Sequence, residues 1–418
     1  MKDYESFFSQ SALKMRESAI RQMGSVLAQA RDMISFAPGY PAEDLFPWEL
    51  LQQITHDLLE SREGSVLQYG PTHGYQPLRE ATVDLMKTRH INSTASDVLI
   101  TSGSQQGLDL VARVLLDPGD VVLMELPSYT GAITAFRNVG ASMVGVRQEA
   151  DGIDLDHLEH TMATLRRDGK RVKVLYLVPN FQNPTGLLLA LKKRLAVLEW
   201  AAKWNVLVVE DDPYRDLYFP DVTKESETRA IAADDNDGRV IYLSSFSKTV
   251  APGLRMAWVH APRAICAKFE LAKQASDLCT GNFDQRIIHE VFRSGLLDKH
   301  LPKLREHYQH KRDAMVGAIG RHLQGRVTWA APRGGFFLWV ALSGGLKSID
   351  VMPHAREHGV IYVDGSAFFV DGSGQEFMRL SFSAPSPARI DEGVARLAAA
   401  VAQAQARGES VSPAATAR

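Results

Sequence analysis

The sequence predicts an α/β fold, in which helices cover both faces of a mostly parallel sheet. Short apolar runs alternate along the chain with stretches of helical periodicity, and this order is typical of strands joined by crossover helices. At 418 residues the chain is too long for one small core and suits two domains. The elements expected first are a strand ending at Thr101, a helix over 104–116, strands over 119–126 and 172–178, a helix over 188–203, and strands over 205–211 and 239–245.

The first strand runs into its helix through the small residues Ser102, Gly103 and Ser104, followed by Gln105. Such a junction presents backbone amide groups and the N-terminus of a helix to an anion. The segment lacks the Gly-Lys-Ser/Thr ending of a nucleotide P-loop, so the anion need not belong to ATP.

Two later strands also end in polar residues. The strand over 172–178 is followed by Asn183 in an Asn-Pro-Thr-Gly turn, a composition that ordinary turns share. The strand over 205–211 ends in several acidic residues, and carboxylates buried there would need a partner. The alternative is that these acids only end the strand and start a turn. These acids and the tyrosine that follows them are Glu210, Asp211, Asp212 and Tyr214.

The strand over 239–245 breaks into hydroxyl residues around a lysine, with an arginine nearby. These residues are Ser245, Ser247, Lys248 and Arg255. A lysine in a pocket can lose its proton and attack an aldehyde, whereas hydroxyl groups and a guanidinium suit a phosphate dianion. Pyridoxal 5′-phosphate carries both an aldehyde and a phosphate. The alternative is a solvated lysine in a surface loop.

The carboxyl ends of parallel strands meet at one edge of a sheet, and ligands bind at that edge. A pyridoxal phosphate bound there would have its phosphate beyond Thr101, its phenolic oxygen near Asn183 and Tyr214, its pyridine nitrogen near Asp211 and its aldehyde near Lys248. An acid beside the pyridine nitrogen would keep it protonated, which makes the ring an electron sink for a carbanion at the substrate's α-carbon. The sequence therefore predicts a pyridoxal phosphate site.

After the lysine loop, residues 255–259 are expected to return as another strand. A charged helical stretch from about residue 286 would then lead into a smaller unit, with strands within 327–342 and 360–383. Arg379 lies in an apolar stretch, where a charge is costly to bury unless it is paired. Its guanidinium would grip the carboxylate of an amino acid through two hydrogen bonds. The alternative is a surface residue on an edge strand.

As an ordered set, these motifs resemble those of the fold-type I pyridoxal-phosphate aminotransferases of class I/II. The resemblance covers roughly residues 15–400, and the segments 67–71, 210–214, 334–339 and 378–383 are most similar to the 2-aminoadipate, kynurenine and aromatic aminotransferase branch. It implies a seven-stranded, mostly parallel sheet in a large domain and a smaller α+β domain. The expected division is an N-terminal arm over 1–50, a large domain over 51–300, a small domain over 301–403 and a disordered tail over 404–418.

The resemblance also implies roles around the cofactor. Lys248 would form the Schiff base, Asp211 would pair with the pyridine nitrogen, and Asn183 and Tyr214 would hold the phenolic oxygen; Lys248, Asp211 and Tyr214 are the catalytic candidates. The residues expected at the phosphate are Ser104, Gln105, Ser245 and Arg255, and Gly103 and Ser247 are further residues expected to bind the cofactor.

Two tyrosines complete the expected cofactor site. Tyr129 would stack on the pyridine ring, although a core tyrosine fits the pattern equally. Tyr69 matches a residue that reaches the phosphate of the neighbouring subunit, so the resemblance implies a homodimer whose chains share each active site.

At the substrate, the resemblance implies five residues: Arg379, Gly39, Asn183, Tyr40 and Arg21. Gly39 and Tyr40 belong to a segment similar to the one that closes over substrate in the family. Arg21 matches a helix arginine that reads an acidic side chain in some members, and the alternative is an exposed helix arginine. Tyr40 and the aromatic residues of 334–339 would make an aromatic or aliphatic pocket, but those residues also fit the core of the small domain.

Composition excludes several other kinds of protein. With 47 basic and 49 acidic residues the net charge is −2, so no overall field favours nucleic acid or an anionic membrane. The start lacks the pattern of a signal peptide, and no apolar run is long enough to span a bilayer. Cys266 and Cys279 form no disulfide framework, which indicates a reducing cytoplasm. The 13 histidines follow no metal-binding spacing, so no metal is expected.

The function expected is transfer of an amino group from an aromatic, 2-aminoadipate-like or aliphatic L-α-amino acid to a 2-oxo acid, with 2-oxoglutarate as the usual acceptor, by a ping-pong mechanism. One alternative is a racemase, β-lyase, decarboxylase or oxidase on the same fold, because the motifs indicate the cofactor better than the reaction. Another is a ligand-sensing module, since some bacterial regulators fuse this fold to a DNA-binding domain. Only about 35 residues precede the closing segment, too few for such a domain.

Overall fold

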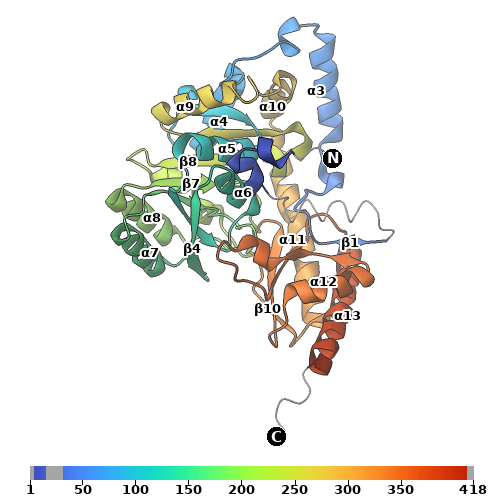
Figure 1. Ribbon diagram of the computed structural model, residues 1–418. Helices are drawn as coiled ribbons and strands as arrows, with labels where there is room; N and C mark the ends of the chain where they lie inside the picture. The colour runs from blue at the N-terminus through green and yellow to red at the C-terminus, as the bar shows by residue number, and fades with distance from the viewer. Residues whose placement is uncertain (1–3, 16–31, 412–418) are drawn as a thin grey trace.

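An eight-stranded sheet forms the centre of the molecule in the computed structural model, which describes residues 4–15 and 32–411 (Figure 1). The strand order is β2-β9-β8-β7-β6-β3-β4-β5. Neighbours are parallel from β8 to β4, whereas β9 is antiparallel to both β8 and β2. The strands are β2 (Val98–Ser102), β3 (Val121–Leu126), β4 (Ser142–Glu149), β5 (Gly152–Ile153), β6 (Val172–Leu177), β7 (Leu207–Asp211), β8 (Val240–Ser245) and β9 (Met256–His260).

Helices cover both faces of this sheet because its central strands are apolar on both sides. Successive residues alternate between the faces: Val208 packs in one core cluster and Val209 in the other. The first cluster includes residues of α4 (Gln76–Thr88), α7 (Leu155–Arg167), α8 (Leu191–Trp204) and α10 (Asn282–Arg293). The second includes residues of α5 (Ser104–Leu115), α6 (Thr130–Asn138) and α9 (Arg263–Gln274). α3 (Trp48–Glu60) extends along one side and contacts α10 (Figure 1).

The expected α/β class with its mostly parallel sheet is confirmed. The helix predicted over 104–116 and the strands predicted over 119–126, 172–178, 205–211 and 239–245 are present with small shifts at their ends. The helix predicted over 188–203 begins later, at Leu191. Two neighbouring strands at one edge of the sheet, β4 and the two-residue β5, were not predicted, and the sheet has eight strands instead of the seven expected.

A smaller unit follows, built on an antiparallel sheet of order β10-β11-β14-β13. The stretch 34–35 joins it, because β1 pairs in parallel with β12. The helical stretch predicted from residue 286 is divided between α10 and α11 by Gly295 in a left-handed conformation. The elements of this unit are β1 (Ile34–Ser35), β10 (Val327–Trp329), β11 (Phe337–Leu342), β12 (Val360–Ile361), β13 (Val363–Asp364), β14 (Phe377–Ser381), α11 (Leu296–His322), α12 (Ser348–Glu357) and α13 (Pro387–Val411).

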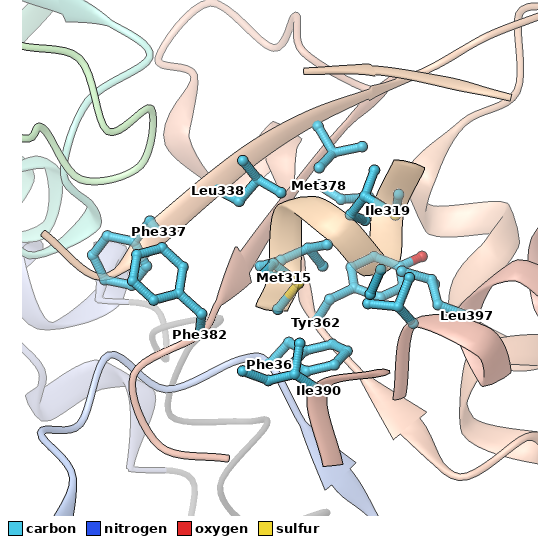
Figure 2. Packing of buried hydrophobic residues seen from close by; sticks show 14 of the residues in the cluster. Phe36, Met315, Ile319, Phe337, Leu338, Tyr362, Met378, Phe382, Ile390 and Leu397 are labelled. Atoms are coloured by element: carbon cyan, nitrogen blue, oxygen red, sulfur yellow. The ribbon is translucent and has the colours of Figure 1, made fainter. Parts of the chain in front are cut away.

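The core of the smaller unit brings together residues far apart in the sequence. Phe36, from the N-terminal part of the chain, lies beside Ile390 of α13, close to Tyr362 (Figure 2). A Cβ atom on Gly393 would lie 2.5 Å from the Phe36 ring, so only glycine lets the ring approach α13 this closely. The N-terminal stretch is thereby fixed against the last helix.

The stretch 404–418, predicted as a disordered tail, is helical as far as Val411. Residues 404–411 belong to α13, and residues 412–418 lie outside the described part of the chain. Leu397, Val401 and Ala404 are buried in the core at helical spacing, which explains why the helix does not stop at residue 403. Among the helices of residues 4–15 and 32–411, none combines the length and apolarity needed to cross a membrane.

Candidate active site

The polar strand ends lie at one edge of the central sheet. Ser102 of β2 and Ser245 of β8 both end beside the start of β9, where their register partners are Met256 and Ala257. Asp211 of β7 is the partner of Leu243 in β8. The parallel direction of these strands thus gathers the phosphate-loop, acid and lysine segments in one place.

Lys248 ends a short 3-10 helix, η7 (Phe246–Lys248), that directly follows β8. The Ser247 amide donates to Ser245 Oγ at 3.0 Å, which turns the chain out of the strand. Lys248 Nζ donates to the Gly39 carbonyl at 2.9 Å and lies 5.7 Å from the centre of the Phe336 ring. Burial, with the Arg379 and Arg255 charges, lowers the pKa of Lys248 to about 8. This half-buried amine is not a solvated loop lysine.

Only one of the three acids at the end of β7 has an oxygen without a partner. Both Glu210 oxygens accept backbone amides, and Asp212 accepts from Asn180 at 2.8 Å and from Tyr242. These two acids lie on one face of the strand, and Asp211 lies on the other. The two flanking acids are therefore structural.

Asp211 is buried beneath the site. Its Oδ2 atom accepts a hydrogen bond of 2.8 Å from the Tyr176 hydroxyl, whereas its Oδ1 atom is buried without a partner. Burial raises the pKa of Asp211 to about 7. A buried carboxylate oxygen of this kind is suited to a cationic N–H group of a ligand.

Arg379 is 1 % exposed on β14, between β11 and β13, so it is not an edge-strand surface residue. Its Nη1 atom donates to Asn183 Oδ1 at 2.8 Å, and its Nη2 atom donates to the Ala37 carbonyl. Its Nε atom is buried without a partner, and the guanidinium carbon lies 4.3 Å from the centre of the Phe337 ring. Burial lowers the pKa of Arg379 to about 10, so it stays charged near neutral pH.

The segment predicted to hold phosphate forms a cradle at the start of α5. Gly103 has a φ of 83°, and a Cβ atom there would collide with Arg255 Nη2. Ser104 begins the helix, and its Oγ atom is buried without a partner. Gln105 donates from Nε2 to the Gly131 carbonyl at 3.0 Å. Backbone amides, a hydroxyl and a guanidinium therefore surround one place where an anion fits.

Tyr214 and Tyr129 lie near these groups. Tyr214 is buried, and its ring meets those of Phe336 and Phe337 edge-on, with centroids 5.6 and 5.9 Å away. Tyr129 is half-buried before α6, and Gly131 is needed there because a Cβ atom would collide with its ring.

The remaining predicted residues differ in their surroundings. Tyr69 and Tyr40 are 78 % and 58 % exposed, whereas Phe336 and Phe337 are core residues. Arg21 lies outside the described residues. Gly39 lies against Phe337, since a Cβ atom there would be 2.5 Å from the ring.

Two contacts of the site were not foreseen from the sequence. Tyr176 looked like an ordinary core residue of an apolar strand, and its hydroxyl reaches Asp211 only because β6 and β7 are neighbours. The Ala37 carbonyl meets Arg379 from far along the chain, and no local pattern marks a backbone acceptor. The pairing order of the strands was the missing information.

The donor set fits pyridoxal 5′-phosphate. The unpartnered Asp211 Oδ1 suits a protonated ring nitrogen, the cradle at Gly103 and Ser104 suits a phosphate, and an amine with a pKa of about 8 suits an aldehyde. Within the described residues, the one cluster with metal-binding spacing is the exposed His56, Asp57 and Glu60 on α3, away from this site.

Comparison with known proteins gives consistent results. Residues 31–397 match the family "Aminotransferase class I and II". An aromatic-amino-acid aminotransferase of Thermococcus litoralis is 40% identical, and the match covers 95% of this chain and 94% of the relative. The crystal structure of Pyrococcus horikoshii kynurenine aminotransferase in complex with PMP superposes with a TM-score of 0.91 at 39% identity, covering 96% of this chain and 98% of that one.

A second solved structure is similar to the same extent. The α-aminoadipate aminotransferase of Thermus thermophilus, complexed with N-(5′-phosphopyridoxyl)-L-leucine, has a TM-score of 0.88 and 38% identity. The match covers 97% of this chain and 100% of that chain. The likeness therefore extends over both the large sheet and the smaller unit.

Proposed function

The chain belongs to the aminotransferase class I and II family, and from this premise we propose that it moves the amino group of an L-α-amino acid to a 2-oxo acid by a ping-pong mechanism. It is an aminotransferase that uses pyridoxal 5′-phosphate. The residue assignment rests on one observation. The half-buried Lys248 and a buried, unpartnered oxygen of Asp211 lie at the same edge of the sheet.

The substrates are an amino acid and an oxo acid. We propose an aromatic, 2-aminoadipate-like or aliphatic amino acid as donor and 2-oxoglutarate as acceptor, supported by relatives named for aromatic amino acids, kynurenine and α-aminoadipate. Arg379 would bind the carboxylate that all these compounds share.

Bound pyridoxal phosphate supplies an aldehyde that takes up an amino group and a protonated ring that accepts the electrons left at the substrate's α-carbon. Asp211 Oδ1 would hold the proton on the ring nitrogen, and Asn183 and Tyr214 would bind the phenolic oxygen. Lys248 Nζ takes the α-proton as general base, and its lowered pKa leaves part of the amine uncharged near neutral pH. Gly103, Ser104, Gln105, Ser245, Ser247 and Arg255 would surround the phosphate.

The same proposal includes a homodimer in which Tyr69 completes the partner's site. Leu67 and Tyr69 are 74 % and 78 % exposed, and exposed apolar side chains close together in the chain suit an interaction surface. The proposal assigns no nucleic-acid or membrane partner, in keeping with a net charge of −2. It places the enzyme in the cytoplasm, in keeping with the free cysteines Cys266 and Cys279.

We propose that the enzyme has the domain division expected from the sequence. A large domain covers 51–300, a small domain covers 301–403, and the N-terminal arm over 1–50 packs with the small domain. The separate sheets and the pairing of β1 with β12 support it.

A half-reaction screen tests the function. Pyridoxal-form protein is mixed with single amino acids, and conversion of the cofactor to its amine form is followed by absorbance. The proposed donors should convert the cofactor stoichiometrically and release the oxo acid, and 2-oxoglutarate should then reverse the change. Release of carbon dioxide or racemised amino acid without amine-form cofactor would contradict amino transfer by this chain.

A further inference from the structure

A fully buried lysine lies behind the phosphate cradle. Lys273 of α9 is 0 % exposed, and α9 packs against α5. Its Nζ atom donates to both oxygens of Asp277, at 2.8 and 2.7 Å, and to Gln106 Oε1 at 3.0 Å. A lysine is buried this completely only when its charge and its donors are matched.

This network holds Ser102, the last residue of β2, by both its backbone and its side chain. The Ser102 amide donates to Gln106 Oε1 at 2.8 Å, and Ser102 Oγ donates to Asp277 Oδ2 at 3.2 Å. Gln106 Nε2 closes the ring by donating to Asp277 Oδ2 at 2.7 Å. The orientation of the Gln106 amide is thereby fixed, since its oxygen accepts from two donors.

Ser102 immediately precedes the cradle. Gly103 and Ser104 follow it, and Arg255 Nη2 lies 3.5 Å from the Ser102 carbonyl. A rotation of the Ser102 backbone would therefore move the first amides of α5, the Ser104 hydroxyl and the contact with Arg255 together.

The charges of Lys273 and Asp277 balance each other, which suits a position next to an anion site. Burial opposes ionisation of Asp277, but hydrogen bonds from Lys273 and Gln106 outweigh it and hold the pKa of Asp277 below its usual value. Without Lys273 this carboxylate would repel a phosphate dianion nearby. An apolar pair would satisfy the packing alone, so a fully buried lysine paired with a half-buried carboxylate at this place calls for another role.

We propose that Lys273 and Asp277 are positioning residues, which hold Ser102 and Gln106 so that the start of α5 is preorganised for the cofactor phosphate. Neither residue touches the cofactor; both act through Ser102. The inference rests on the proposed function, because it gives that site its phosphate geometry.

The test compares apo-protein variants in two readouts: the melting temperature, and the affinity for pyridoxamine phosphate, which cannot bond covalently to Lys248, measured by calorimetry. Replacing the pair by Lys273→Met with Asp277→Leu should leave the melting temperature near that of the wild type yet weaken binding about tenfold. Lys273→Met alone should weaken it further, because it leaves the Asp277 charge uncompensated.

A matched control is Lys193→Met on α8. Lys193 is also buried and paired with carboxylates, Glu149 and Asp151, but it lies at the β4-β5 edge, opposite to β2. Its removal should lower the melting temperature and leave pyridoxamine phosphate affinity unchanged. Should the double variant not fold, Asp277→Asn keeps the side-chain shape and is expected to weaken binding in the same direction.

The ³¹P chemical shift of bound pyridoxamine phosphate gives a readout of the cradle itself. The variants of Lys273 and Asp277 should shift this signal, and the Lys193 variant should not. Unchanged affinity and an unchanged ³¹P signal in the folded double variant or in Asp277→Asn would overturn the positioning role while leaving the proposed function intact. Failure of the wild-type protein to bind pyridoxamine phosphate would instead overturn the proposed function, and this inference with it.

Discussion

Burial moves the pKa values of three site residues from their usual ranges. Lys248 falls to about 8, Arg379 falls to about 10, and Asp211 rises to about 7. In each case desolvation is the largest cause, since it disfavours the charged form. The lysine is thereby made nucleophilic while the arginine remains a cation that can bind a carboxylate.

The lowered pKa of Lys248 predicts a pH dependence for cofactor attachment. Only the uncharged amine attacks an aldehyde, so the rate at which apo-protein takes up pyridoxal phosphate should rise as pH increases through about 8 and then level off. Stopped-flow absorbance measures this rate, and Lys248→Ala, which lacks the amine, should show no such phase. A rate that keeps rising up to about pH 10, the range of an ordinary lysine, would contradict the assigned environment.

The raised pKa of Asp211 predicts a change in stability with pH. The folded carboxyl has a pKa of about 7 and the unfolded one of about 3.9, so between these values the folded apo-protein holds a proton that the unfolded chain has lost. The free energy of unfolding should therefore fall as pH rises from about 4 to about 7.

Asp211→Asn should make this fall shallower in thermal or denaturant unfolding of the apo-protein. It should not abolish the fall, because burial also raises the pKa of Glu125 to about 7 and that of Glu210 to about 8. Identical slopes in the wild-type and Asn variants would show that Asp211 is not held in a desolvated environment.

At the scale of elements, the site depends on how each strand ends. The strand ends at Asp211 and Ser245 could be predicted because apolar runs stop at polar residues there. β4 was not foreseen, because all of its side chains except Val146 are half-buried or exposed and its polar residues hide the strand pattern. The break at Gly295 was also missed, since flanking helical patterns continue through a single glycine.

The turn into α5 predicts a specific effect of one glycine. Gly103→Ala adds a Cβ atom that collides with Arg255 Nη2 at a φ of 83°, so cofactor affinity should fall along with stability. Gly119→Ala is the matched control, because Gly119 has a φ of 91° but nothing within 4 Å of an added Cβ. Both variants should lose about 1 kcal/mol of stability from backbone strain. Equal pyridoxal phosphate affinities in a titration of the two would contradict the cradle.

The same elements show which site residues a sequence can reveal. Lys248, Asp211 and Asn183 stand in local motifs whose composition departs from that of their apolar strands, so each could be predicted. The Lys273–Asp277 pair looks like an ordinary helical ion pair at i and i+4, and its link to Ser102 arises only when α9 packs against α5. Long-range contacts of this kind have no local signal.

At the scale of the whole molecule, the N-terminal stretch ties the smaller unit to the site. The Gly39 carbonyl accepts from Lys248 at 2.9 Å, and the Tyr40 carbonyl accepts from Ser383 Oγ at 2.6 Å. The Ala42 amide donates to the Tyr308 hydroxyl at 3.0 Å. Movement of the smaller unit would thus be transmitted directly to the lysine.

The proposed sharing of sites between subunits predicts complementation. Tyr69→Ala should be poorly active and Lys248→Ala inactive, but a mixed dimer contains one site with both an intact Lys248 and the partner's intact Tyr69. After subunit exchange, an equal mixture should regain about a quarter of wild-type activity, since half of the dimers carry one repaired site. Activity no higher than the average of the two separate variants would show that Tyr69 serves its own chain or no site.

The central claim is that the Lys248 amine bonds to pyridoxal phosphate. Purified protein saturated with the cofactor is reduced with borohydride, digested and mapped by mass spectrometry. The phosphopyridoxyl group should be found on the peptide carrying Lys248, at one group per chain, and should be absent from Lys248→Ala. Its appearance on another lysine, or a chain that remains unmodified after saturation and reduction, would contradict the claim.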